Sequence, residues 1–253
     1  MGENATVDIE TGEIIAEEPK KKGKKKSEAP ASFFKEYKVR LTFREELLGT
    51  ASSDPNVHEK FIASKAPDAP TREEEVESLG VEEVTHQGMT IFSRNKEGEP
   101  ILWNYQIRGF FKSAAKAIAE EIPDLKVTAY KSNVDEHLFV LERQIVLHIP
   151  EGEQIGSCQR PLRAETAQGP RVALANSETC PAGTWCEFTI LNKRPDKITD
   201  EHIEMWLYKG RHNGIGQWRN SGKGIFKAKI LETRTIDARE YYRSMYSMTE
   251  DED

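Results

Sequence analysis

The stretch of sequence that decides the fold is GRHNGIGQWRNSGKGIFKAKIL, residues 210–231. It places closely spaced glycines around Trp218 and Arg219 and then runs into an alternating, strand-like tail. The glycines inside the loop are Gly214, Gly216, Gly222 and Gly224. All charged residues of the stretch are Lys or Arg, although the 253-residue chain has a formal net charge of -7 at pH 7. A basic loop in an acidic chain indicates a focal site for an anion rather than a generally basic surface.

Two interpretations of this loop are open at the level of sequence. Glycines adopt positive φ and let backbone N–H groups approach a ligand, and consecutive amides in such turns form anion-binding concavities. Arg211, Arg219 and Lys223 would add positive charge, and Trp218 offers a ring on which a nucleic-acid base can stack. Alternatively, the glycines form a tight structural turn and Trp218 lies in the core. The loop is not a P-loop, because Gly224 follows Lys223 where Ser or Thr is required.

Outward from the loop, the apolar pattern predicts both strands and helices. Strand-like patterns lie at 36–43, 124–130, 137–149, 183–191 and 224–231, and a hairpin pattern lies at 89–105. The clearest helix begins at a cap on Asn104 and ends before Pro123, and a shorter helix begins at a cap on Thr199. Strands outnumber helices, and the helices join strands that are not adjacent. This order predicts an α+β fold, with a ferredoxin-like (RRM-like) antiparallel sheet and helices on one face.

Composition divides the chain into a folded body and two charged ends. Residues 1–32 hold the run PKKKGKKK (19–26) and few large apolar side chains, and the chain closes on TEDED. Such segments cannot bury enough apolar surface to offset the entropy of ordering. We therefore expect a disordered charged tail at 1–32, a single domain at 33–246 with a helical insertion at 44–88, and a disordered acidic tail at 247–253. The lysine run is either a nuclear signal or tether to nucleic acid, or a solubilising tail.

Three motifs of this chain resemble motifs of the RAMP superfamily and follow one another in that family's order. The superfamily comprises the ferredoxin-fold backbone and processing subunits of CRISPR effector complexes. GIGQWRNSGKG (214–224) is similar to the family's glycine-rich loop between a helix and a late strand. PAGTWCEFTIL (181–191) is similar to its P-x-G-T segment that leads into a strand. LWNYQIRGFFKSAAKAI (102–118) resembles its helix, without the leading Pro-Gly-Ser. The resemblance spans roughly residues 36–50 and 89–231, and similar reading frames in phages and prophages make a phage or prophage source an expectation.

The resemblance adds a second candidate contact, the polar and basic excursion at 156–174. In RAMP backbone subunits a comparable protrusion reaches over RNA and the neighbouring subunit, whereas the alternative is a solvated loop with surface ion pairs. Two further cations share one face of the predicted helix and would face either solvent or a nucleic-acid backbone. The candidate residues outside the glycine loop are Arg160, Arg163 and Arg171 in the excursion, and Arg108 and Lys112 on the helix.

Catalysis has little support in the sequence. No Ser-His-Asp order, pair of carboxylates or metal-ligand constellation is readable, and the three cysteines have no zinc spacing. Asp54 resembles the acid with which some RAMP backbone subunits cut target RNA, and it fits equally well as a helix N-cap. We therefore expect no enzyme activity and no cofactor, with a ribonuclease kept as an alternative.

The sequence predicts a protein that binds single-stranded nucleic acid, with RNA favoured over DNA, and that self-associates or joins a ribonucleoprotein complex. No stretch reaches the ~20 apolar residues of a membrane helix, so we expect no membrane partner. The odd count of three cysteines, with no C-x-x-C pair, is typical of a reduced compartment, so we expect a cytoplasmic location, in the host cytoplasm if the source is viral. A second alternative is a phage anti-defence protein that mimics or sequesters a CRISPR complex or a signalling nucleotide.

Overall fold

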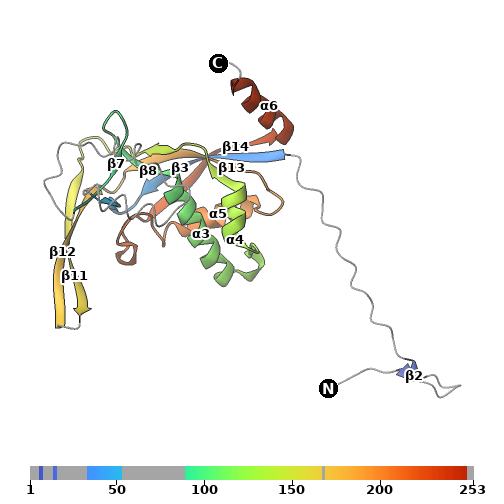
Figure 1. Ribbon diagram of the computed structural model, residues 1–253, viewed down its shortest axis with the longest axis horizontal. Coiled ribbons are helices and arrows are strands. Elements are labelled where there is room, and N and C mark those ends of the chain that lie inside the picture. The colour runs from blue at the N-terminus through green and yellow to red at the C-terminus, as the bar shows by residue number, and fades with distance from the viewer. Residues whose placement is uncertain (1–5, 8–13, 16–32, 53–88, 167–168, 250–253) are drawn as a thin grey trace. The chain divides into compact units, whose positions relative to one another are not determined.

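The computed structural model divides the chain into two units, Met1–Pro30 and Ala31–Asp253. The residues that it describes are 6–7, 14–15, 33–52, 89–166 and 169–249 (Figure 1). In the first unit, Thr6–Val7 (β1) pairs antiparallel with Ile14–Ile15 (β2). Most of the expected charged tail, most of the expected helical insertion and the last four residues of the chain lie outside the described residues.

The second unit is built on a four-stranded antiparallel sheet. Its strands are Phe33–Phe43 (β3), Leu138–Val140 (β9), Trp185–Asn192 (β13) and Phe226–Asp237 (β14), in the spatial order β14-β3-β13-β9. The helix Asn104–Glu121 (α3) joins β3 to β9, and the helix Asp200–Lys209 (α5) joins β13 to β14. When the elements inserted between them are left out, the order along the chain is strand, helix, two strands, helix, strand, with the first strand beside the last. That order is the ferredoxin-like fold, so the predicted fold class is confirmed.

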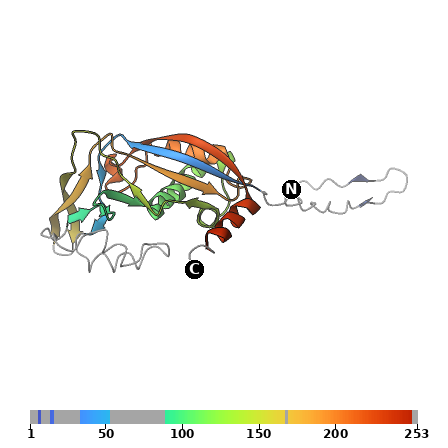
Figure 2. The same ribbon diagram turned by 90° about the horizontal axis from the view of Figure 1, so that it is seen from above.

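The core lies between this sheet and its helices. In β3, Tyr37, Val39, Leu41 and Phe43 alternate with outward side chains and are buried. The apolar stripe of α3 and the fully buried Trp206 of α5 pack against the same face. Figures 1 and 2 show α3, α4 and α5 together on one side of the sheet. The helices therefore cover one face of the sheet, as the strand order predicts.

A long hairpin occupies the excursion predicted at 156–174. Its strands, Gly156–Thr166 (β11) and Gly169–Cys180 (β12), pair antiparallel over their whole length. Within the described residues, only the base of the hairpin joins other strands: β12 pairs with Leu47–Leu48 (β4) and with Met89–Ile91 (β6), which in turn pairs with Ala51–Ser52 (β5). The excursion is therefore a two-stranded arm, seen as the yellow pair in Figure 1, and not an irregular loop.

The other elements confirm part of the predicted order and correct part of it. The predicted hairpin at 89–105 contains Ser93–Arg94 (β7) paired with Pro100–Trp103 (β8), and β8 also pairs with Gln144–Val146 (β10). The predicted strand at 124–130 is wrong: this segment holds the 3-10 turn Pro123–Leu125 (η1) and leads into the helix Tyr130–His137 (α4). Leu125 and Val127 alternate and are buried, but Pro123 starts a turn there instead of a strand.

The boundaries of two helices also differ from the prediction. The N-cap of α3 is Trp103, not Asn104, and the side chain of Gln106 accepts a hydrogen bond from the Trp103 N–H at 2.8 Å. The C-terminal helix Ala238–Thr249 (α6) runs into the range expected to be a disordered tail. The helix begins at Ala238 because the Asp237 carboxylate accepts hydrogen bonds from the N–H groups of the first turn.

Candidate nucleic-acid interface

The arms of the glycine loop, which connects α5 to β14, are held together by backbone contacts. A Cβ on Gly214 would lie 2.4 Å from the Gly224 carbonyl carbon, and a Cβ on Gly224, at φ +70°, would lie 1.9 Å from the Ile215 oxygen. The Ile215 N–H donates to the Gly224 oxygen, and the Gly224 N–H donates to the Glu46 oxygen. These two glycines are therefore required by backbone packing, and the structural interpretation holds for them.

The middle of the loop differs from its arms. Trp218 has φ 56° and ψ 33°, a left-handed conformation that costs a non-glycine residue about 1–2 kcal/mol, and it precedes the 3-10 turn Arg219–Ser221 (η2). Gly216, two residues earlier, also has positive φ. Among the described residues, the N–H groups of 216–219 have no hydrogen-bond acceptor. Alternating backbone conformation with unused N–H groups is the arrangement of an anion-binding nest.

Trp218 is not a core residue. The residue is 38% exposed, which places it among the exposed large apolar residues of the described part of the chain. Strained backbone at an exposed aromatic residue favours a role at the surface, because neither core packing nor turn geometry requires an indole there. The interpretation of Trp218 as core is therefore wrong.

Arg160 of β11 is the residue that the fold brings to the loop. Its guanidinium carbon lies 5.1 Å from the centre of the Trp218 ring, and its Nη2 donates to the side chain of Gln217 at 2.8 Å. The residue is only 8% exposed, yet its Nε and Nη1 atoms have no hydrogen-bond partner. Burial of a cation without a carboxylate partner is costly, and a bound anion would relieve that cost.

The three cations of the loop itself differ in the contacts that their side chains make. Lys223 donates to the Glu46 carboxylate at 2.8 Å, and this contact raises the pKa of Lys223 while it neutralises the charge. The Arg211 guanidinium lies over the ring of Tyr208, at 4.7 Å, at the end of α5. Arg219 is exposed and has no ion pair within the described part of the chain. Of the three, Arg219 is therefore the cation that has neither an ion pair nor a ring contact among the described residues.

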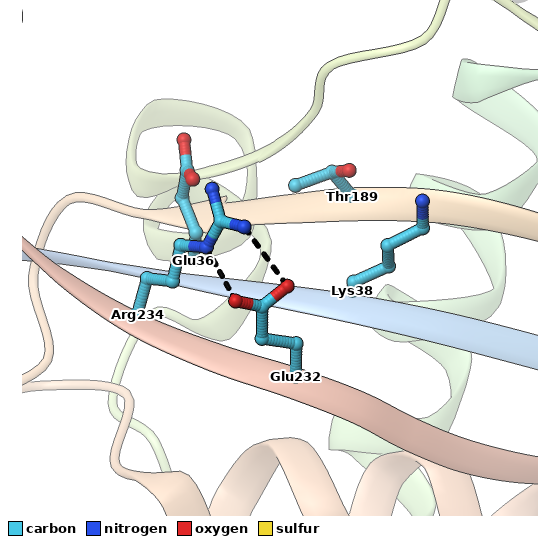
Figure 3. A pocket seen from close by; sticks show the side chains of 5 residues that line it. All are labelled: Glu36, Lys38, Thr189, Glu232 and Arg234. Atoms are coloured by element: carbon cyan, nitrogen blue, oxygen red, sulfur yellow. Dashed lines mark hydrogen bonds and ion pairs between the residues drawn. The ribbon is translucent and has the colours of Figure 1, made fainter.

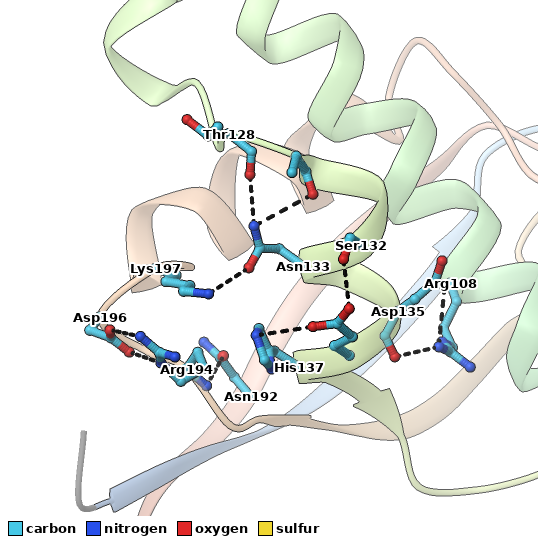
Figure 4. A network of polar contacts seen from close by, with 12 residues as sticks. Arg108, Thr128, Ser132, Asn133, Asp135, His137, Asn192, Arg194, Asp196 and Lys197 are labelled. Atoms are coloured by element: carbon cyan, nitrogen blue, oxygen red, sulfur yellow. Dashed lines mark hydrogen bonds and ion pairs between the residues drawn. The ribbon is translucent and has the colours of Figure 1, made fainter. Parts of the chain in front are cut away.

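Arg108 and Lys112 do not join the loop. Arg108 donates to the backbone oxygen and the carboxylate of Asp135 in α4, at 2.9 and 3.2 Å, and Lys112 pairs with the same carboxylate at 2.5 Å. Figure 4 shows Arg108 and Asp135 facing each other across α3 and α4. Contrary to the expectation of a face open to solvent or to a groove, both cations hold α4 against α3.

Other candidates are placed only in part. Arg163 and Arg171 lie in the hairpin, where Arg163 pairs with Val172 in register and Arg171 pairs with Ala164, and their side chains lie outside the described residues. Asp54 lies outside them as well. No group of three or more metal-ligating side chains gathers among the described residues. In the same part of the chain, no helix has both the length and the apolar composition to cross a membrane.

Gln217 and Glu46 contribute to this site and were not predicted from the sequence. Gln217 lies inside the loop that the sequence analysis singles out. Its side chain is a neutral amide, however, so the pattern of charges does not mark it. Glu46 gives no signal at all, because its role depends on the segment after β3 running beside the loop.

Comparison with solved structures finds, among others, a chain in the cryo-EM structure of the type III-B Cmr-beta bound to cognate target RNA. The TM-score is 0.42 and the sequence identity is 12%, and the match covers 81% of this chain and 61% of that chain. This chain thus spans about three fifths of the length of that neighbour. No protein-family model and no curated protein matches the sequence.

The strand order of the main sheet and the geometry of the loop together define the class of this protein. It is a ferredoxin-like α+β protein in which the loop between the last helix and the last strand of the fold meets a long β-hairpin. At the meeting point lie one buried guanidinium, one exposed indole and a run of backbone N–H groups that have no acceptor within the described part of the chain.

Proposed function

We propose that this protein binds single-stranded nucleic acid, with RNA favoured over DNA, between the glycine loop and the base of the β11–β12 hairpin. The observation that carries the proposal is the Arg160 guanidinium. It is buried beside Trp218, and its Nε and Nη1 nitrogen atoms have no hydrogen-bond partner. A phosphate oxygen is the acceptor that a guanidinium binds best, because it accepts charge-assisted hydrogen bonds.

The surrounding groups suit a single strand better than a duplex. Backbone N–H groups at 216–219 can donate to phosphate, and the exposed indole of Trp218 can stack on an unpaired base. In a duplex the bases are already stacked and closed to an indole. The acidic net charge of -7 also disfavours sequence-independent duplex binding, which depends on many phosphate contacts.

RNA and a ribonucleoprotein setting follow from the resemblance of the loop, the strand entry and the α3 helix to RAMP proteins. The proposal is therefore that this chain works as an RNA-binding, non-catalytic subunit that joins copies of itself or other proteins on one strand. The hairpin beyond Arg160, whose strands pair only with each other among the described residues, supplies the reach for such a contact.

The experiment is a fluorescence-anisotropy titration of the full chain with labelled oligonucleotides of about 15 nucleotides, a length within the site sizes of single-strand binders. We expect binding to single-stranded RNA, weaker binding to the same sequence as duplex, and a loss of affinity of about tenfold or more in Arg160→Gln. Arg239→Gln, which removes an exposed cation from α6, is the matched control. Wild-type protein that binds neither RNA nor DNA single strands at low salt would contradict the proposal.

A further inference from the structure

The outer face of the main sheet, on the side away from α3 and α5, carries many charged side chains. On β3 the outward side chains alternate with the buried ones, and on β14 the outward side chains Lys227 and Lys229 are exposed. Lys227 lies beside Thr42 and Lys229 lies beside Arg40 in the β14–β3 register. The charged side chains of the two strands therefore stand next to one another on one surface.

This face has two halves of different character. In the half far from the glycine loop, a shallow pocket is lined by Glu36, Lys38, Thr189, Glu232 and Arg234. Figure 3 shows Glu232 and Arg234 bonded side by side there, at 2.6 and 3.0 Å. Positive and negative charges alternate in this half and largely cancel.

The half next to the glycine loop is basic. Lys227, Lys229 and Arg44 are exposed, and none of them has an ion pair within the described part of the chain. Arg40 is paired with Glu187, at 2.5 Å, which is the only acid on β13 beside it. We call Arg40, Arg44, Lys227 and Lys229 the basic half-face.

Two aromatic rings lie beside Arg40, at the edge of the basic half-face. The Arg40 guanidinium carbon lies 4.4 Å from the centre of the Trp185 ring, and the His148 ring stacks on Trp185 at 4.1 Å with an angle of 27°. His148, at the end of this column, is an exposed residue. Cations interleaved with stacked rings are characteristic of surfaces that hold single-stranded nucleic acid, because each ring can receive a base.

The basic half-face is continuous with the glycine loop. Gly224 ends the loop, and Lys227 follows it by three residues in β14. Arg44 donates its backbone N–H to the Ile225 oxygen at 2.9 Å, so the end of β3 lies directly beside the end of the loop. Lys227 and Lys229 then lie about 7 Å apart along the strand, because each residue of a strand adds about 3.4 Å.

We propose that the basic half-face is a second contact surface for the same single strand, which runs from Trp218 and Arg160 across the start of β14 towards His148. This inference rests on the proposed function and extends it. Beyond the glycine loop, the phosphates of the bound strand would contact Lys227 and Lys229, and one of its bases would stack on His148. An acidic protein partner would match the charge but would leave the aromatic column unused.

The test compares Lys227→Gln/Lys229→Gln with Lys126→Gln/Lys131→Gln. Both double variants remove two exposed positive charges, but the second pair lies next to and within α4, on the helical side of the sheet. Binding of a single-stranded RNA of about 15 nucleotides is measured as a function of salt. The slope of log Kobs against log salt should fall in magnitude by roughly 1.4 in the first variant, from two lost phosphate contacts, and stay unchanged in the second.

A salt slope in Lys227→Gln/Lys229→Gln equal to that of the wild type would overturn this inference and leave the half-face to an acidic protein. The proposed function would survive that result if Arg160→Gln still weakened binding. A wild-type protein that binds no single strand would overturn both. His148→Ala should weaken binding of the same RNA about fivefold or more by loss of one stacked base, and its thermal melt should match that of the wild type because the ring is exposed.

Discussion

At the scale of single residues, the site depends on two groups whose environment does not fit a purely structural role. Arg160 is buried with two unpaired N–H atoms, and Trp218 is exposed on strained backbone. A folded chain gains nothing from either feature alone, since one leaves donors unsatisfied and the other raises the backbone energy. Both are explained if a phosphate and a base complete the contact.

Trp218→Ala should separate binding from folding. The exposed indole contributes little to the core, so the melting temperature should change by only a few degrees, while RNA affinity should fall by about 1–3 kcal/mol through loss of a stacked base. Trp206→Ala is the control, because Trp206 is fully buried and its loss should cost about 3–5 kcal/mol of stability. A large loss of stability in Trp218→Ala with unchanged binding would contradict the assignment.

Arg219→Gln and Lys223→Gln should differ although both remove one charge from the same loop. Arg219 has no ion pair among the described residues, so its loss should lower the salt slope of RNA binding by roughly 0.7. Lys223 is held by Glu46, so its loss should change the slope less. Salt titrations of the two variants in parallel decide the point, and a larger effect of Lys223 would show that the Glu46 contact opens on binding.

At the scale of elements, the loop combines a structural frame with a functional centre. Gly214 and Gly224 let its two arms pack backbone against backbone, and the hydrogen bond from the Gly224 N–H to the Glu46 oxygen fixes the frame to the segment after β3. The residues between the arms are then presented at the base of the β11–β12 hairpin. The two interpretations of the glycines that the sequence leaves open therefore apply to different residues of one loop.

Gly224→Ala and Gly222→Ala test this division. Both residues have positive φ, but a Cβ at position 222 meets open space while one at position 224 meets the Ile215 backbone. Gly222→Ala should cost about 1–2 kcal/mol of stability, the strain of a left-handed alanine. Gly224→Ala should cost clearly more, measured by chemical denaturation. Equal costs would contradict a tight backbone contact between the two arms at Gly224.

The N-terminus of α5 gives a pH-dependent prediction. Lys35 and the Tyr37 hydroxyl both donate to the Asp200 carboxylate, at 2.6 to 2.7 Å, and lower the pKa of Asp200 below its ordinary value of 3.8. A lowered pKa in the folded state stabilises the fold above about pH 4, and this contribution is lost as the pH falls below that value. The stability difference between wild type and Asp200→Asn should therefore shrink on acidification below pH 4, followed by thermal melts. A constant difference would contradict the contact.

The elements with long, regular patterns could be predicted from the sequence. β3, α3, β13 and α5 follow apolar periodicities that local sequence carries by itself. The segment 124–130 could not be read correctly, because a short alternation of buried residues fits a turn against the core as well as a strand. The contact of Arg160 with Trp218 could not be predicted either, since it depends on how the hairpin base meets the loop. For the same reason, the pairing of Arg108 and Lys112 with Asp135 was missed.

At the scale of the whole molecule, charge is distributed unevenly. The chain is acidic overall, but one end of the main sheet brings together four cations that have no ion pair among the described residues: Arg44, Arg219, Lys227 and Lys229. Such a distribution guides an anionic strand to one place and limits binding elsewhere. It also makes affinity sensitive to salt, so binding constants have meaning only at a stated ionic strength.

The proposed joining of copies on one strand is tested by the mass of the particle. A head-to-tail contact makes open arcs or filaments, so light scattering should show a mass that rises with protein concentration and rises further with RNA. Nuclease treatment should lower the mass again. A protein that stays monomeric at high concentration with RNA present would leave the single-strand site standing but remove self-association from the account.

The most direct measurement of the central claim is photo-cross-linking of wild-type protein to single-stranded RNA that carries a photoreactive uridine, with the linked peptides identified by mass spectrometry. The account predicts cross-links on the peptide that contains Trp218, with their yield reduced in Arg160→Gln and unchanged in Arg239→Gln. Cross-links confined to the helical side, on α3 or α4, or equal yields in all three proteins, would contradict it.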